Sequence, residues 1–80
     1  MKYTEIDGED INNFKAPPKK FRIILYDAYT FIHYFINDYT NASLAKKRAK
    51  KIVDNDSDMF YHTSVYDESG SVIVKYGTYS

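Results

Sequence analysis

Cysteine is absent from this chain of 80 residues. A disulfide, a thiolate zinc site and a thiol nucleophile are therefore all excluded. A chain of this length forms one domain and buries only about 60–65% of the surface that its unfolded form exposes. Because no disulfide can constrain it, its stability depends on side-chain packing and on self-association.

A net charge is also absent, because 11 Lys and Arg residues balance 11 Asp and Glu residues. Zero net charge gives no overall attraction to nucleic acid or to anionic lipid. The charges are nevertheless segregated along the chain. Acids dominate residues 1–14, whereas bases dominate residues 15–22 and 46–51.

Long apolar runs are missing as well. The most apolar stretch, residues 21–36, is too short and too polar to span a bilayer, being interrupted by Arg22, Asp27, Thr30 and His33. The acidic N-terminal residues do not resemble a signal peptide. We therefore expect a cytoplasmic protein without a membrane partner.

Aromatic residues, by contrast, are abundant. They make up 18% of the chain, with nine Tyr and no Trp, and this composition favours β-strands. Phe, Tyr, Met, Ile, Asn and Lys, which have AT-rich codons, are together nearly half of the residues. This bias indicates an AT-rich genome, such as that of a phage or a low-GC bacterium.

Residues 1–16 are polar and acidic, with isolated apolar side chains at Ile6, Ile11 and Phe14. The segment is either an arm that docks through these side chains or a frayed terminus. Two consecutive prolines at 17 and 18 block both helix and ladder hydrogen bonds. The sequence thus predicts an N-terminal arm over 1–16 and a single α+β domain over 17–80.

Residues 20–39 fit two patterns. At a period of two they form a pair of strands joined near residues 27–30, and at a period of 3.6 they form one helix from 19 to 37. Ile, Tyr, Phe and Thr dominate, while Leu, Ala and Glu are nearly absent. This composition favours two strands.

Residues 42–54 are typical of an amphipathic helix, with Thr40 or Asn41 as its N-cap. One half of the helical wheel is apolar and carries Leu44, Ala45, Ala49, Ile52 and Val53. The small Ala45 and Ala49 lie at the centre of this half and allow close approach to a sheet. The other half is basic.

Residues 59–66 and 71–76 predict two further strands, joined by a turn over 67–70 in which Gly70 takes a left-handed conformation. The expected fold is α+β with the order ββαββ, an antiparallel four-stranded sheet with one amphipathic helix packed on one face. The alternative, ααββ, has two helices followed by a C-terminal hairpin.

Two candidate metal sites are weak. Asp54, Asp56 and Asp58 alternate as at the start of an EF-hand loop, but Met59 and Val65 stand where that loop needs Gly and Glu. A solvated acidic connector explains the pattern better. The two histidines, His33 and His62, lie on different expected hairpins and need not meet. We expect no metal, no cofactor and no catalytic residue.

The basic run is the strongest local feature, with one helical face bearing Lys46, Lys47, Lys50 and Lys51. This face is either a solvated helix surface or a contact for nucleic acid or another anion. Nucleic-acid binding would place further bases beside it, and Lys19, Lys20 and Arg22 are the candidates.

Several tyrosines fall on the expected strands and form a candidate interface, namely Tyr26, Tyr34, Tyr61, Tyr66 and Tyr76. Tyrosine is favoured at protein interfaces because its side chain is large, rigid and amphipathic. Stacking of single-stranded bases and ordinary surface positions are the alternatives.

One helix can cover only one face of such a sheet, although the expected strands carry apolar side chains on both faces. This imbalance favours self-association as a homodimer, unless the arm folds back over the same face. The leading hypothesis is a non-enzymatic interaction or assembly module, and the alternative is a small nucleic-acid-binding regulator that uses the Lys46–Lys51 face.

Overall fold

The stretch that fits both patterns forms two strands in the computed structural model, which describes residues 3–55 and 60–77. Strand β2 spans Phe21–Asp27 and β3 spans Ile32–Tyr39. Between them, the Asp27 carboxylate accepts hydrogen bonds from the backbone N–H groups of Tyr29 and Thr30, at 2.9 and 3.4 Å. Phe31, predicted as the first residue of the strand, instead lies outside it with a left-handed φ of 62°.

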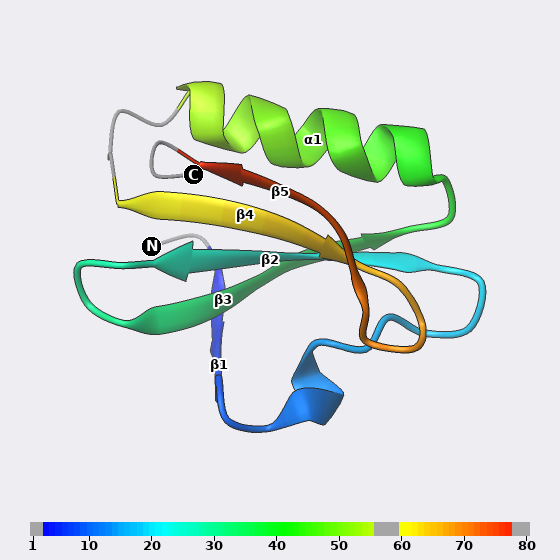
Figure 1. Cartoon of the computed structure of the whole chain (residues 1–80), viewed down its shortest axis with the longest axis horizontal. Helices are drawn as coiled ribbons and strands as arrows, with labels where there is room; N and C mark the ends of the chain where they lie inside the picture. Colours follow the sequence, from blue (N-terminus) through cyan, green and yellow to red (C-terminus); the bar gives the residue numbers. More distant parts are fainter. Residues whose placement is uncertain (1–2, 56–59, 78–80) are drawn as a thin grey trace.

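The sheet has five strands, and the prediction of four was wrong. Strands β4 (Tyr61–Tyr66) and β5 (Val72–Gly77) form the C-terminal hairpin. The additional strand, β1, spans Thr4–Ile6 and pairs antiparallel with β3. Three residues with one apolar side chain are too few to show alternation in a sequence, so only the pairing reveals this strand. The order across the sheet is β1-β3-β2-β4-β5 (Figure 1).

Helix α1 spans Ala42–Asn55, close to the predicted 42–54. Its N-cap is Asn41, whose Oδ1 accepts hydrogen bonds from the N–H groups of Ser43 and Leu44, at 2.8 and 3.3 Å. Leu44 was assigned to the apolar half of the helix, but its side chain is 54% exposed. It lies at the margin of the apolar half, where side chains of the helix point away from the sheet.

The hydrophobic core lies between α1 and the strands. Ala45 and Ala49 are fully buried in one cluster with Ile23 of β2 and Val65 of β4. The hydroxyl of Thr63, also fully buried, donates a 2.9 Å hydrogen bond to the carbonyl of Ala49. Partly buried side chains surround this cluster, namely Phe21, Ile36, Tyr39, Val74 and Tyr76.

A bulge in β3 decides which of its side chains reach this core. Ile24 pairs with Phe35 and Ile23 pairs with Asn37, so Ile36 is an extra residue in β3. Such an insertion reverses the alternation of the faces beyond it. As a result Ile36 and Tyr39 both contact the core, while Phe35 and Asp38 lie on the opposite face.

The turn between β4 and β5 is built around Asp67. Its carboxylate accepts hydrogen bonds from the N–H groups of Ser69 and Ser71, at 2.9 and 3.0 Å. Gly70 has a φ of +87°, as predicted from the sequence of this turn.

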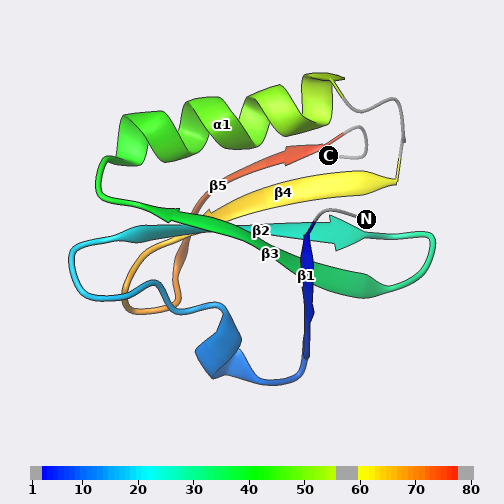
Figure 2. The ribbon, with the colours of Figure 1, turned by 180° about the vertical axis from the view of Figure 1, so that it is seen from behind.

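In the views of Figures 1 and 2, α1 lies along one side of the sheet and the 3-10 helix η1 (Ile11–Asn13) along the other.

Candidate functional site

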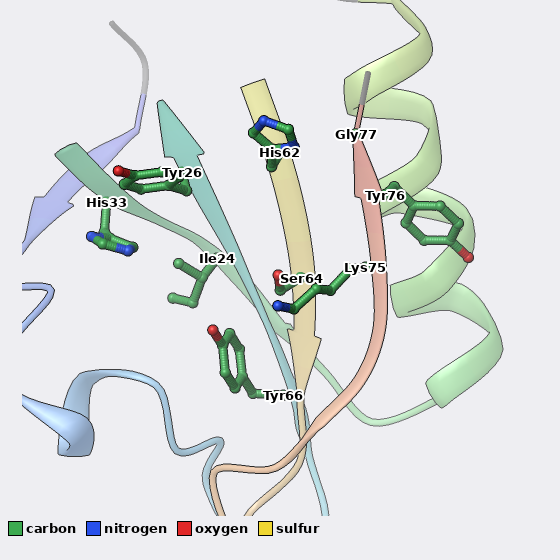
Figure 3. A pocket seen from close by; sticks show the side chains of 9 residues that line it. All are labelled: Ile24, Tyr26, His33, His62, Ser64, Tyr66, Lys75, Tyr76 and Gly77. Carbon is green, nitrogen blue, oxygen red and sulfur yellow. The ribbon is translucent and has the colours of Figure 1, made fainter. Parts of the chain in front are cut away.

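The sheet face opposite α1, called here the open face, carries aromatic and polar side chains. On the central strands these are Ile24 and Tyr26 of β2 and Ser64 and Tyr66 of β4 (Figure 3). A concave cavity with a volume of about 730 Å³, called here the hollow, lies among them. Its other lining residues are His33, His62, Lys75, Tyr76 and Gly77.

The N-terminal segment closes one end of the open face. The Phe14 ring packs against two residues of that face, with centroids 5.4 Å from His33 and 5.3 Å from Tyr66. Ala16 is buried, and its N–H donates a 3.1 Å hydrogen bond to the carbonyl of Asp67. The segment therefore folds back over this face through Phe14, whereas Ile11, which was also expected to dock, is 64% exposed.

An ion pair anchors the same end of the open face. Arg22 Nε and Nη2 donate to the two carboxylate oxygens of Asp38 at 2.8 and 3.1 Å, and Nη1 donates to the Asn13 carbonyl at 3.0 Å. The guanidinium also lies 4.9 Å from the centroid of the Phe35 ring. Arg22 is thus committed to holding the N-terminal segment and lies on the face opposite α1.

The two histidines, which the sequence left unconnected, line the same hollow. Tyr26 of β2 is opposite both of them in register, with His33 on one side and His62 on the other. The rings of Tyr26 and His33 are 4.5 Å apart. Each imidazole lies directly against a glycine. A Cβ on Gly8 would overlap His33, and a Cβ on Gly77 would overlap His62.

Burial changes the acid–base chemistry of the hollow. It lowers the pKa of His33, so the neutral imidazole is favoured. Burial also raises the pKa of Tyr66, and a hydrogen bond with Ser64 only partly opposes this shift. Within residues 3–55 and 60–77, no group of three or more His, Cys, Asp or Glu side chains is placed to hold a metal ion.

The candidate basic face lies on α1, away from the hollow. Lys46, Lys47, Lys50 and Lys51 are all exposed. Lys50 pairs with Asp54 at 2.9 Å, and this hydrogen bond, with the charge of Asp54, raises the lysine pKa. The other two residues of the acidic connector, Asp56 and Asp58, lie outside the described residues.

The sequence suggested that Lys19, Lys20 and Arg22 would lie beside the basic face of α1 if the protein binds nucleic acid. Lys19 and Lys20 are exposed in the turn that precedes β2. Arg22 points to the opposite side of the sheet, where it pairs with Asp38. The structure therefore does not add Arg22 to the basic face of α1.

The candidate tyrosines divide between the two faces of the sheet. Tyr26 and Tyr66 line the hollow, whereas the Tyr76 side chain points toward α1 (Figure 3) and packs against the core. Tyr34 and Tyr61 pair with Leu25 and Asp27, which by alternation share the sheet face of Ile23. These five residues do not form one surface.

Sequence reasoning overlooked Lys75 and Ser64 as members of a site. The alternation within β4 carried a usable signal, because His62, Ser64 and Tyr66 share one face of a strand. Lys75 could not be added from sequence, since its neighbour across the hairpin depends on the register of β5 with β4.

Comparisons with protein-family models, with curated proteins and with solved structures find no match to this chain. No helix within the described part of the chain is long and apolar enough to cross a membrane.

Proposed function

We propose that this protein is a non-enzymatic assembly module that forms a homodimer by joining the β5 strands of two copies. The observation that carries the proposal is the exposed edge of β5. It is the last strand of the sheet and has no partner on its outer side within residues 3–55 and 60–77. Val72 and Ile73 on this strand are 41% and 38% exposed.

The two edges of the sheet differ in how well they are protected. β1 has three residues and an exposed Glu5, and short, charged edges resist pairing with other strands. β5 has six residues and no acidic side chain. Its one base, Lys75, extends over β4 on the open face, away from the outer edge of β5 (Figure 3).

A two-fold axis suits this edge, since antiparallel pairing of identical strands is self-complementary. A pairing centred on Val74 places Val72 of one copy opposite Tyr76 of the other. The same pairing places Ile73 of one copy opposite Lys75 of the other. Backbone hydrogen bonds then join two five-stranded sheets into one.

The proposal also takes α1 as the cover of one sheet face, which the burial of Ala45 and Ala49 beside Ile23 and Val65 supports. In a dimer joined at β5 the two helices lie on the same side of the joined sheet. The open faces of the two copies then form one continuous surface on the other side.

Sedimentation velocity at micromolar concentration tests the proposal, with a dimer as the expected species. Ile73→Lys introduces a like charge opposite Lys75 of the other copy and should yield monomers. The matched control is Leu44→Lys, which changes an exposed apolar residue on α1 and should leave the dimer intact. A parent protein that sediments as a 9.4 kDa monomer contradicts the proposal.

A second candidate function is nucleic-acid binding through α1, favoured by the shared exposure of Lys46, Lys47, Lys50 and Lys51. Lys50 forms an ion pair with Asp54, and Arg22 forms one with Asp38. Both pairs weaken this candidate, because the two charges are already partly neutralised.

A further inference from the structure

The side chains that line the hollow on the open face include hydrogen-bond donors and a positive charge but no negative charge. None of its nine lining residues is acidic. The side chains that face the hollow include one lysine, two histidines, two tyrosines and one serine, because the side chain of the third tyrosine, Tyr76, points toward α1. Lysine donates only, and hydroxyl and imidazole groups can also donate hydrogen bonds. Such a lining is suited to an anionic group and contains nothing that would repel one.

Lys75 supplies the positive charge of the hollow. Its ammonium makes no ion pair with any residue of the ranges 3–55 and 60–77, where the two ion pairs are Arg22–Asp38 and Lys50–Asp54. Figure 3 shows its side chain lying over β4 beside Ser64, on the side of the sheet that carries Tyr66. The charge is therefore directed over the hollow.

Tyr66 and Ser64 place hydroxyl groups near this ammonium. The Tyr66 phenol carries its proton at neutral pH, as tyrosines ordinarily do, and burial raises its pKa further, so it can donate a hydrogen bond. Ser64 hydrogen-bonds the same phenol and is the cross-strand partner of Lys75. An anion beside Lys75 thus has a charge and nearby hydroxyl groups.

The rest of the hollow is lined mainly by aromatic rings and by Ile24. Ile24 is 2% exposed and forms the floor, and the rings of Tyr26 and Tyr66 stand on either side of it (Figure 3). Phe14, packed against His33 and Tyr66, closes one end. A volume of about 730 Å³ is within the range of small-molecule sites.

We propose that the hollow binds a small organic anion with a planar aromatic ring. The ring packs against the rings of Tyr26 and Tyr66, and the carboxylate or phosphate of the ligand pairs with the Lys75 ammonium. The inference goes beyond assembly through β5, because the hollow is complete within one copy of the chain.

Nuclear magnetic resonance titration of the uniformly ¹⁵N-labelled full chain tests this site. The probes are adenosine 5′-monophosphate for a phosphate and 4-hydroxyphenylacetate for a carboxylate, and adenosine and 4-hydroxyphenylethanol are their neutral counterparts. Either anion should shift the backbone amides of Tyr26, Ser64, Tyr66 and Lys75 saturably, with a dissociation constant on the order of 1 mM or tighter. The anion that binds more tightly identifies the headgroup.

Variants at Lys75 distinguish a built site from general charge attraction. Lys75→Gln should weaken binding about tenfold, the contribution of one charge-assisted hydrogen bond, and Lys75→Arg should restore it. Lys46→Gln removes an exposed charge from the opposite side of the molecule and should change nothing. Sedimentation of the same samples shows whether the dimer persists.

Three outcomes overturn the proposal. They are the absence of saturable shifts with both anions at 10 mM in a folded sample, equal affinity for the neutral counterparts, and equal weakening by Lys46→Gln and Lys75→Gln. None of these results bears on the β5 dimer, which Ile73→Lys tests separately.

Discussion

The two faces of the sheet are covered in different ways. On one face, Ala45 and Ala49 of α1 are fully buried against Ile23 and Val65. On the other, a single ring, Phe14, packs across Tyr66 and His33 and leaves the hollow beside it. Small residues let a helix approach a sheet closely, whereas one large ring at the end of a short 3-10 helix covers only the area beneath it.

This difference separates stability from binding within a small domain. The helix-covered face contains most of the fully buried side chains, among them Ile23, Leu25, Thr63 and Val65. The open face carries the histidines, the tyrosines of the hollow and Lys75. We therefore expect substitutions on the first face to affect unfolding, and substitutions in the hollow to affect ligands more than folding.

The largest effect is expected from Ala49→Leu on the helix-covered face. Additional methylene groups at a fully buried position force α1 away from the sheet, with a cost of about 1–3 kcal/mol in the free energy of unfolding. Urea denaturation followed by circular dichroism measures this change. A variant as stable as the parent would show that Ala49 does not face the sheet tightly.

On the open face, Phe14→Ala should destabilise by about 1 kcal/mol, since the partly exposed ring contributes less than a fully buried one. The matched control is Ile11→Ala in the same segment, because Ile11 is 64% exposed and its loss should have little effect. Both are measured by urea denaturation. Equal destabilisation by the two variants would contradict the docking of the segment through Phe14.

The next effect is a pH dependence from His33. Burial lowers its pKa in the folded state, so the unfolded chain binds a proton more readily. The contribution of His33 to stability is complete above its unfolded pKa of about 6.5 and decreases as the pH falls through the folded pKa. Thermal unfolding between pH 7.5 and pH 5 should show this loss, and it should be smaller in His33→Gln.

The smallest effect on folding is expected on the outer face of α1. Replacing Lys46, Lys47, Lys50 and Lys51 with Gln should leave the unfolding midpoint nearly unchanged, because the four side chains are exposed. The same variant tests the second candidate function. Binding of the parent to short DNA or RNA at about 50 mM salt, lost in the variant and weakened steeply by added salt, would favour that function over assembly alone.

Much of the fold could be predicted because its signals are local. The strands of 21–39 follow from their Ile, Tyr and Phe content, α1 from its apolar period and Asn41 cap, and the turn at 67–70 from Gly70. The fifth strand could not be predicted, since Thr4–Ile6 has no pattern of its own. Its partner, β3, lies about 30 residues away in the chain.

The candidate site was less predictable than the fold. The basic residues of α1 are adjacent in sequence and were found at once, but the hollow draws its residues from four strands. Alternation within a strand groups side chains two residues apart, as for His62, Ser64 and Tyr66. Which strands lie next to each other, and therefore which groups combine, depends on a sheet order that alternation does not contain.

The sequence by itself determined the kind of elements and the absence of thiol chemistry, because propensity, capping and composition act within a few residues. Tertiary structure alone decided that His33 and His62 flank Tyr26, that Lys75 lies over Ser64, and that Arg22 holds the N-terminal segment rather than joining α1. The bulge at Ile36 was also decided by tertiary structure. The one inserted residue moves the side chains that follow it in β3 to the opposite face of the sheet. These outcomes depend on register, which is settled by how whole strands pack together.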